Sequence, residues 1–447
     1  MKLSFHNIYH TFLQWKNHSI VQQYGVNTFW SLFARGLWIL TAFSVGILVT
    51  RKLGPEQFGI LNYSIAWIGM FAVILDLGVS GIIQRELVNH PEQRDDLLGN
   101  FACFRIIQTG FLLLIAGVTL LLTGQTPEVT KLILILMAGY LFSFGAVTGT
   151  YFTANVQSKY EAFSQIISCF LYNSVRCAAV VFEWDLAVYA AAESLLLISY
   201  NISLLCFYSR KADSLRKWKF RFKSAFALLL PAIPLSLSGI FITIYNKTDI
   251  LMLEYFQGFE DIAFYSLATR FTLNLSLFSG LIATIFSAAI AGAKKVSDEE
   301  YKKQLHRFYF LLFWFMIPFF PLFWIVSPYL FPFLYGDAFS AASDVFSVYI
   351  CSLPFTGVMN AFFWHSTLEN RLKSIAFANG AGALINVGLN CFMIPAMGIV
   401  GAAWSSVGAM PMGFLLVLLC TKQGRSSLKL ILHSLITLPS FRLRKEC

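Results

Sequence analysis

Two long apolar runs joined by a short charged turn determine the fold: VNTFWSLFARGLWILTAFSVGILV (Val26–Val49), RKLGPEQFG (Arg51–Gly59) and FGILNYSIAWIGMFAVILDLGVSGII (Phe58–Ile83). Each run holds one charged residue, Arg35 in the first and Asp76 in the second. A helix of about 20 apolar residues is long enough to cross the ~30 Å hydrocarbon layer of a membrane. The stretch therefore predicts a hairpin of two transmembrane helices that are joined by the charged turn.

The composition of the whole chain is typical of a membrane protein. Of its 447 residues, 57% are hydrophobic and 13% are charged, whereas a soluble domain carries about 25% charged residues. The net charge of +10 would suit a nucleic-acid-binding protein if the basic residues formed one patch. They stand instead in short segments between the apolar runs, as in the cytoplasmic loops of membrane proteins. The composition therefore predicts no nucleic-acid partner.

The hairpin pattern recurs along the chain and predicts an all-α, polytopic membrane protein of about 12 transmembrane helices in two six-helix halves. A weak internal repeat supports the two halves, because LGPEQFG (Leu53–Gly59) resembles QGFEDIA (Gln257–Ala263). The predicted parts are residues 1–25 as a cytoplasmic N-terminal segment, 26–208 as an N-terminal six-helix lobe, 209–224 as a basic cytoplasmic linker, 225–420 as a C-terminal six-helix lobe and 421–447 as a basic cytoplasmic tail.

The positions of lysine and arginine predict the orientation of the chain. If the N-terminus is cytoplasmic, 25 of the 33 basic residues lie in cytoplasmic segments and at most four lie in external turns. By the positive-inside rule, this distribution predicts that both termini are cytoplasmic. The densest basic run, Ser209–Lys223, contains one acid, Asp213. A patch for anionic lipid or nucleic acid is one interpretation of this run, and a solvated linker is the interpretation that we favour.

No motif of a nucleotide-binding protein or a metalloprotein occurs in the chain. There is no GxxxxGKS/T phosphate-binding loop and no GxGxxG dinucleotide fingerprint. The eight cysteines include no CxxC pair. His6 and His10 are four residues apart but have no third ligand nearby in the sequence. The sequence therefore predicts no catalytic residue, no cofactor and no metal site.

Charged residues inside the apolar runs are the candidate functional residues. An arginine at the centre of a membrane costs ~2.5–3.5 kcal/mol and usually faces a cavity or a partner. The candidate substrate-binding residues are Arg35, Arg176, Lys247 and Arg270, and the candidate ion-coupling residues or ion-pair partners are Asp76, Glu193 and Asp249. The cations outnumber the acids, and a guanidinium group matches phosphate oxygens in bidentate geometry. This excess predicts a cationic cavity that binds an anionic substrate.

Ion pairs within the membrane are the alternative for the same residues. Arg176 and Glu193 stand at matching depths on the two arms of one predicted hairpin, where they can neutralise each other. Asp76 is a candidate to pair with Arg35 or to cap a helix, and Asp249 is the candidate partner of Arg270. If Asp249 or Glu193 is unpaired, it becomes a candidate for proton coupling. Arg105 stands about one turn from the cytoplasmic end of its run, so we expect its charge to extend to the membrane surface.

Five short motifs carry a resemblance to a known family. They are RKLGPEQFG (Arg51–Gly59), DLG (Asp76–Gly78), DILML (Asp249–Leu253), YGDAF (Tyr335–Phe339) and GIVGAA (Gly398–Ala403). Each motif alone is weak, but their order and spacing resemble the polysaccharide-lipid flippases of the multidrug/oligosaccharidyl-lipid/polysaccharide exporter superfamily. The resemblance covers the whole chain after its N-terminal segment.

The resemblance implies a bacterial inner-membrane flippase of the O-antigen type. Such a protein moves an undecaprenyl-pyrophosphate-linked oligosaccharide, the repeat unit of O-antigen or another surface polysaccharide, by alternating access between two lobes. It also implies membrane lipid, a polysaccharide polymerase and a chain-length regulator as partners. No site residue follows from the resemblance, because the family has no strict catalytic motif. The alternatives are a multidrug exporter of the same fold, with an acidic interior, and a non-transporting scaffold of a polysaccharide assembly complex.

Overall fold

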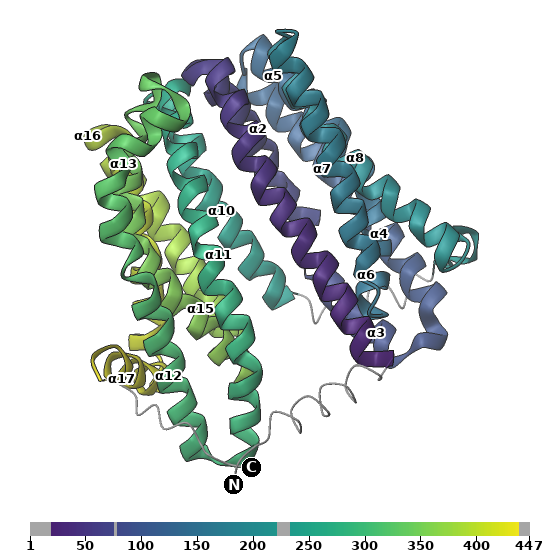
Figure 1. Cartoon of the computed structure of the whole chain (residues 1–447), viewed down its shortest axis with the longest axis vertical. Helices are drawn as coiled ribbons and strands as arrows, with labels where there is room; N and C mark the ends of the chain where they lie inside the picture. The colour runs from purple at the N-terminus through teal and green to yellow at the C-terminus, as the bar shows by residue number, and fades with distance from the viewer. Residues whose placement is uncertain (1–18, 76–77, 221–232, 438–447) are drawn as a thin grey trace, which may run out of the picture. The chain divides into compact units, whose positions relative to one another are not determined.

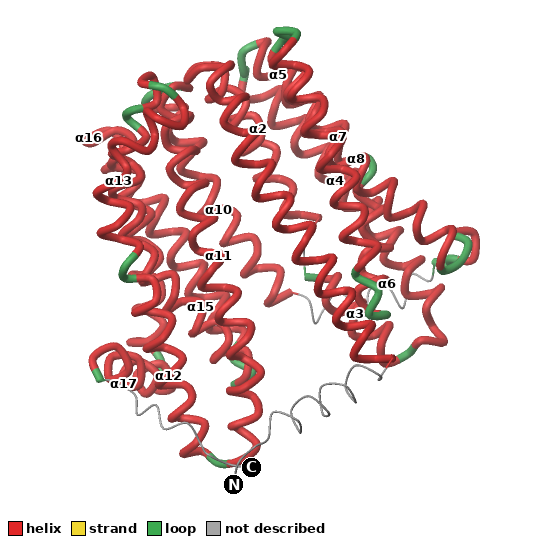
Figure 2. Tube along the Cα trace, in the orientation of Figure 1, coloured by secondary structure: helices red, strands yellow, loops and turns green. Residues whose placement is uncertain are grey.

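The computed structural model describes residues 19–75, 78–220 and 233–437. Every regular element in these ranges is a helix, as Figure 2 shows. The helices, all labelled in Figure 1 except α14, are α2 (Ser19–Ala72), α3 (Val79–Asn89), α4 (Arg94–Thr123), α5 (Pro127–Tyr140), α6 (Ala146–Ala154), α7 (Lys159–Val181), α8 (Leu186–Lys211), α10 (Ile233–Phe256), α11 (Phe259–Val296), α12 (Asp298–Met316), α13 (Phe319–Tyr335), α14 (Ala342–Tyr349), α15 (Leu353–Leu368), α16 (Leu372–Cys420) and α17 (Lys422–Ile436). The predicted all-α, polytopic membrane fold is confirmed.

Two of these helices bend at a glycine. Gly54 in α2 has φ 71° and ψ 176°, and Gly398 in α16 has φ 60° and ψ −138°. Glycine adopts positive φ without strain, so it can interrupt a helix at these points. Within the described ranges, nine segments are long and apolar enough to cross a membrane, and two of them contain these bends. Each bent segment counts as two membrane-spanning helices. With α10, which carries the polar run Asn246–Asp249, the segments therefore account for the predicted number of about 12 helices.

Capping residues set several of the helix starts. Thr126 precedes Pro127 at the start of α5, and its side chain accepts a hydrogen bond from the backbone N–H of Val129. At the start of α12, the Ser297 hydroxyl accepts from the backbone N–H of Glu300 at 3.2 Å. Such caps satisfy donors that the first turn of a helix leaves unpaired, and each contributes about 1 kcal/mol. These helix ends are therefore encoded locally in the sequence.

The described chain divides into two compact units. The first unit comprises residues 19–52 and 71–220, and the second comprises residues 53–70 and 234–437. The bend at Gly54 divides α2 into a first arm before it and a second arm after it. The second arm belongs to the second unit, where Gly59 lies against the backbone of Phe259. The ring centroids of Tyr63 and Phe259 are 5.5 Å apart. The second arm of α2 therefore joins the second unit by its packing and not by its place in the chain. This packing brings the two stretches of the predicted repeat into contact.

Arg105 of α4 packs inside the first unit. Only 9% of its surface is exposed, and it donates a hydrogen bond to the backbone carbonyl of Leu75. Gln108, about one turn later, donates to the carbonyl of Ile74 at 2.6 Å. The predicted extension of Arg105 to the membrane surface is therefore wrong. The two side chains instead satisfy carbonyl groups that the end of a helical segment leaves unpaired.

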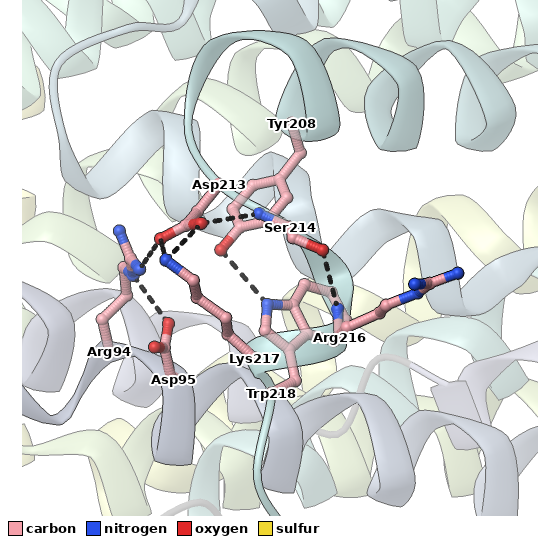
Figure 3. Close-up of polar contacts among 8 residues, drawn as sticks. All are labelled: Arg94, Asp95, Tyr208, Asp213, Ser214, Arg216, Lys217 and Trp218. Atoms are coloured by element: carbon pink, nitrogen blue, oxygen red, sulfur yellow. Dashed lines mark hydrogen bonds and ion pairs between the residues drawn. The ribbon is translucent and has the colours of Figure 1, made fainter.

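The beginning of the predicted basic linker packs against the first unit (Figure 3). Arg94 of α4 donates a hydrogen bond to Asp213 at 2.6 Å, and the Nζ atom of Lys217 lies 2.9 Å from the same carboxylate. Trp218 donates from Nε1 to the Tyr208 hydroxyl at 3.1 Å. Hydrogen bonds from Lys217 and Arg94 hold the pKa of the Asp213 carboxyl below its ordinary value. These contacts fix the start of the linker, whose last residues lie outside the described ranges.

Candidate functional site

A cavity of about 520 Å³ lies within the first unit and is lined by α2, α7 and α8. Its lining residues are Ser31, Arg35 and Trp38 from α2; Glu161, Ala162, Gln165 and Ser168 from α7; Leu196, Leu197 and Tyr200 from α8; and Ser158, which precedes α7. Successive α2 residues of this set are four and three positions apart, and residues at these spacings share one face of a helix. One face of each helix therefore forms the wall of the cavity.

Polar contacts at both ends of the cavity fix the first arm of α2 along α7. Asn27 donates to the carbonyl of Val156 at 2.5 Å and accepts from the backbone N–H of Lys159 at 3.0 Å. Four turns further along α2, the Thr41 hydroxyl lies 3.2 Å from the Sγ atom of Cys169. These contacts place the lining face of α2 against α7.

Arg35, a predicted substrate-binding residue, lies in this cavity. Its side chain is exposed, and no ion pair to it is formed within the described ranges. Its predicted partner Asp76 lies outside the described residues. An exposed guanidinium group that lines a cavity has its N–H donors available to a ligand.

Glu161 brings a carboxylate to the same cavity. It accepts hydrogen bonds from the Thr153 hydroxyl at 3.0 Å and from the Tyr200 hydroxyl at 3.3 Å. Reasoning from the sequence misses Glu161, because it lies in the polar segment between two apolar runs and not within a run. The signal that identifies it is the four-residue spacing to Gln165, which places both side chains on one face of α7.

Tyr172 contacts both members of the predicted Arg176–Glu193 pair. The guanidinium carbon of Arg176 is 4.7 Å from the centroid of the Tyr172 ring, and the Tyr172 hydroxyl donates to the Glu193 carboxylate at 2.5 Å. In the described part of the chain, no ion pair joins Arg176 directly to Glu193. Tyr172 also stacks on Trp38 of the cavity, with ring centroids 6.1 Å apart. The two charged residues are therefore linked to the cavity wall through this tyrosine.

The second unit holds two of the predicted cations, Lys247 and Arg270, near the second arm of α2. Arg270 of α11 donates to the side-chain oxygen of Asn62 at 3.1 Å, and its guanidinium carbon is 5.9 Å from the Phe58 ring centroid. Lys247 of α10 lies beside Gly69, where an added Cβ atom would be 3.4 Å from its Cε atom. The second arm of α2 therefore contacts both cations.

Asp249 is buried among neutral donors, with 1% of its surface exposed. Its carboxylate accepts hydrogen bonds from the Tyr265 hydroxyl, from the Ser406 hydroxyl at 2.5 Å and from the Asn390 amide at 2.5 Å. Across the described residues no ion pair connects Asp249 with Arg270, which is the partner that the alternative interpretation assigned. Three neutral donors satisfy this carboxylate in place of a cation.

A second cavity, of about 250 Å³, borders this polar cluster in the second unit. Ser406 and Tyr349 line it, and the Tyr245 hydroxyl donates to the carbonyl of Ser406 at 2.6 Å. Its other lining side chains are neutral, and many of them are aromatic or aliphatic. The two cavities therefore differ in character, because the first presents both a cation and a carboxylate.

Metal-ligand side chains do not gather in the described part of the chain. No group of three or more His, Cys, Asp or Glu side chains in these ranges could hold a metal ion. The seven described cysteines are free. The absence of a metal or cofactor in the whole protein remains a prediction from the sequence.

The fold is similar to solved structures of membrane transporters. A lipid II flippase, MurJ, in an inward closed conformation has a TM-score of 0.67 at 18% identity, covering 92% of this chain and 90% of MurJ. An inward-facing multidrug resistance MATE family transporter of the MOP superfamily has a TM-score of 0.68 at 16% identity, covering 88% of this chain and 95% of the transporter. These likenesses show that the chain has the fold of these transporters.

Sequence comparison gives the family. A Shigella flexneri protein described as "Putative O-antigen transporter" is 24% identical over 399 residues, which cover 85% of this chain and 93% of the relative. Residues 25–291 match the family described as polysaccharide biosynthesis protein. Since this match extends over more than half of the sequence, the chain belongs to the polysaccharide biosynthesis protein family.

Proposed function

We propose that this protein is a flippase that translocates an undecaprenyl-pyrophosphate-linked oligosaccharide across the bacterial inner membrane by alternating access. The observation that carries the proposal is Arg35, an exposed guanidinium group in a cavity of about 520 Å³ with polar and aromatic walls. A guanidinium group binds phosphate oxygens through parallel hydrogen bonds. The family and the likenesses to an O-antigen transporter and a lipid II flippase support the proposal.

The other intramembrane cations also favour an anionic substrate. Lys247 and Arg270 both lie near the second arm of α2, and within the described ranges neither forms an ion pair with an acid. Like charges that are partly removed from water raise the free energy of the empty site, and a bound anion offsets this cost. We propose that Arg35 and Arg176 in the first unit, and Lys247 and Arg270 in the second, each contribute to binding of the anionic part of the substrate.

Two alternatives make different predictions. A multidrug exporter of the same fold is expected to present an acidic interior to cationic drugs, whereas the Lys247–Arg270 pair presents positive charge. A non-transporting scaffold of a polysaccharide assembly complex would tolerate removal of these cations without loss of export. A polysaccharide polymerase and a chain-length regulator are the protein partners that we propose for the flippase.

We expect both termini to be cytoplasmic, because 25 of the 33 lysine and arginine residues lie on that side in this orientation. In a variant without the native cysteines, a single cysteine at Lys217 is expected to be protected from a membrane-impermeant thiol reagent added outside. A single cysteine at Ser340 is expected to be labelled. Labelling at position 217 in intact cells would contradict the proposed topology.

Depletion of the protein tests the proposed function. We expect the undecaprenyl-pyrophosphate-linked oligosaccharide to accumulate in the cytoplasmic leaflet and the surface polysaccharide to disappear, because the lipid carrier no longer crosses. Spheroplasts are treated with a glycosidase added outside, and the lipid is then extracted. The measurement is the fraction of lipid-linked oligosaccharide that escaped the glycosidase, with and without a plasmid copy of the gene. Unchanged distribution of this lipid after depletion would rule out the flippase.

Asp249 and Glu193 are the residues that we propose to couple transport to protons. Each is an acid inside the membrane that accepts hydrogen bonds from neutral groups, and an amide in its place cannot exchange a proton. We expect Asp249→Asn or Glu193→Gln to abolish the dependence of flipping on a pH gradient in vesicles. Asp185→Asn, at an exposed turn, is the control. If both variants keep full pH-dependent transport, neither acid couples it.

A further inference from the structure

The cavity of the first unit is lined by more polar and charged side chains than the binding of pyrophosphate requires. Arg35 supplies a positive charge, but Glu161 places a negative charge in the same cavity. A carboxylate repels phosphate, so Glu161 serves a different part of the ligand. An ionised carboxylate accepts hydrogen bonds and donates none. The part of the ligand that meets Glu161 therefore carries hydrogen-bond donors.

Glu161 is held ready for such donors. The hydroxyls of Thr153 and Tyr200 each occupy one of its two oxygens, and a carboxylate has about four lone-pair positions. Each oxygen of Glu161 therefore keeps a lone-pair position for a ligand. Because these two bonds position the carboxylate before the ligand arrives, little conformational entropy is lost on binding.

Gln165 and Trp38 extend the same wall. Gln165 lies one helical turn after Glu161 on the lining face of α7 and offers an amide donor and acceptor. Trp38 comes from the lining face of α2, and its ring is supported by stacking on Tyr172. A sugar ring presents hydroxyl groups at its edge and C–H groups on its faces. The acceptors and donors of this wall can bind the sugar hydroxyl groups, and the aromatic ring of Trp38 can pack against a C–H face of the sugar.

We propose that Glu161, Gln165 and Trp38 form a carbohydrate subsite that recognises sugar hydroxyl groups of the lipid-linked oligosaccharide. Arg35 binds the pyrophosphate next to it. The volume of about 520 Å³ lies within the ~300–1,000 Å³ range of small-molecule sites, so it exceeds what a phosphate group alone needs. This inference rests on the proposed flippase function and assigns the part of the substrate that the first unit reads.

The test compares two lipids that differ only in the sugar. The full-length protein in nanodiscs is titrated with undecaprenyl pyrophosphate and with the undecaprenyl-pyrophosphate-linked oligosaccharide extracted from the source cells. We expect the wild type to bind the glycosylated lipid more tightly. Glu161→Gln and Gln165→Ala are each expected to weaken binding of the glycosylated lipid about tenfold, the value of one buried hydrogen bond to a charged or polar partner. Binding of undecaprenyl pyrophosphate should stay unchanged.

Control variants separate the subsite from general effects. Glu128→Gln makes the same change on α5, outside the cavity, and should change neither affinity. Arg35→Ala should weaken the binding of both lipids by the same factor. If Glu161→Gln does not fold, Gln165→Ala and Trp38→Ala carry the test. The subsite is overturned if the wild type binds both lipids equally, or if the subsite variants lose the same affinity for both lipids. Either result leaves the flippase function unaffected. No binding of either lipid overturns the proposed function and the subsite with it.

Discussion

Replacing Gly59 by alanine is expected to destabilise the second unit by about 3 kcal/mol, at the upper end of the usual cost of overpacking. A Cβ atom at Gly59 would lie 1.8 Å from the backbone oxygen of Phe259. Backbone atoms of a packed helix cannot move aside as a flexible side chain can. The second arm of α2 must therefore separate from α11. Because folded proteins are stable by only about 5–15 kcal/mol, we expect a lower midpoint of thermal unfolding and a lower yield of monodisperse protein.

Gly46 provides the matched control in the same helix. No atom lies within 4 Å of a Cβ atom built at Gly46, so Gly46→Ala should keep or raise the unfolding midpoint through better helix propensity. Equal midpoints for the Gly59 and Gly46 variants would contradict the close packing of α2 on Phe259. The comparison isolates the contact, since both changes add one methyl group to α2.

Replacing Arg270 by alanine is expected to reduce export of surface polysaccharide by about 10- to 100-fold, the value of one or two charge-assisted hydrogen bonds. Arg270→Lys keeps the positive charge and loses the planar fork. It should therefore impair export less if charge dominates phosphate binding. The measurement is surface polysaccharide per unit of membrane-inserted protein. Arg85→Ala, which removes an exposed arginine paired with Glu86, should leave export unchanged. Normal export by Arg270→Ala would remove Arg270 from the substrate site.

The same assay decides between binding and neutralisation for Arg35. If Asp76 only neutralises Arg35, the double variant Arg35→Gln with Asp76→Asn should restore folding and export together. If Arg35 binds pyrophosphate, the double variant should reach the membrane and fail to export. Normal surface polysaccharide from the double variant would exclude Arg35 as a ligand residue.

The membrane fold is predictable from the sequence, because the cost of placing a residue in hydrocarbon is largely local. The runs Val26–Val49 and Phe58–Ile83 are long enough to span a bilayer whatever they pack against. The bend at Gly54 is predictable for the same reason, since Gly-Pro interrupts a helix by its own backbone geometry. Candidate cations such as Arg35 and Arg270 stand out because a charge in an apolar run requires an explanation.

The partners of the charged residues depend on which helix faces meet, and only the tertiary structure decides that. Asp249 accepts from three neutral side chains, two of them on α16, although Arg270 is the nearer candidate in the sequence. Glu161 lies in a polar segment by sequence and reaches a cavity because α2 and α8 pack beside α7. The second arm of α2 joins the second unit through Gly59. Each outcome rests on side chains far apart in the sequence that satisfy hydrogen bonds or fill space where water is excluded, and hydropathy along the chain carries no record of those contacts.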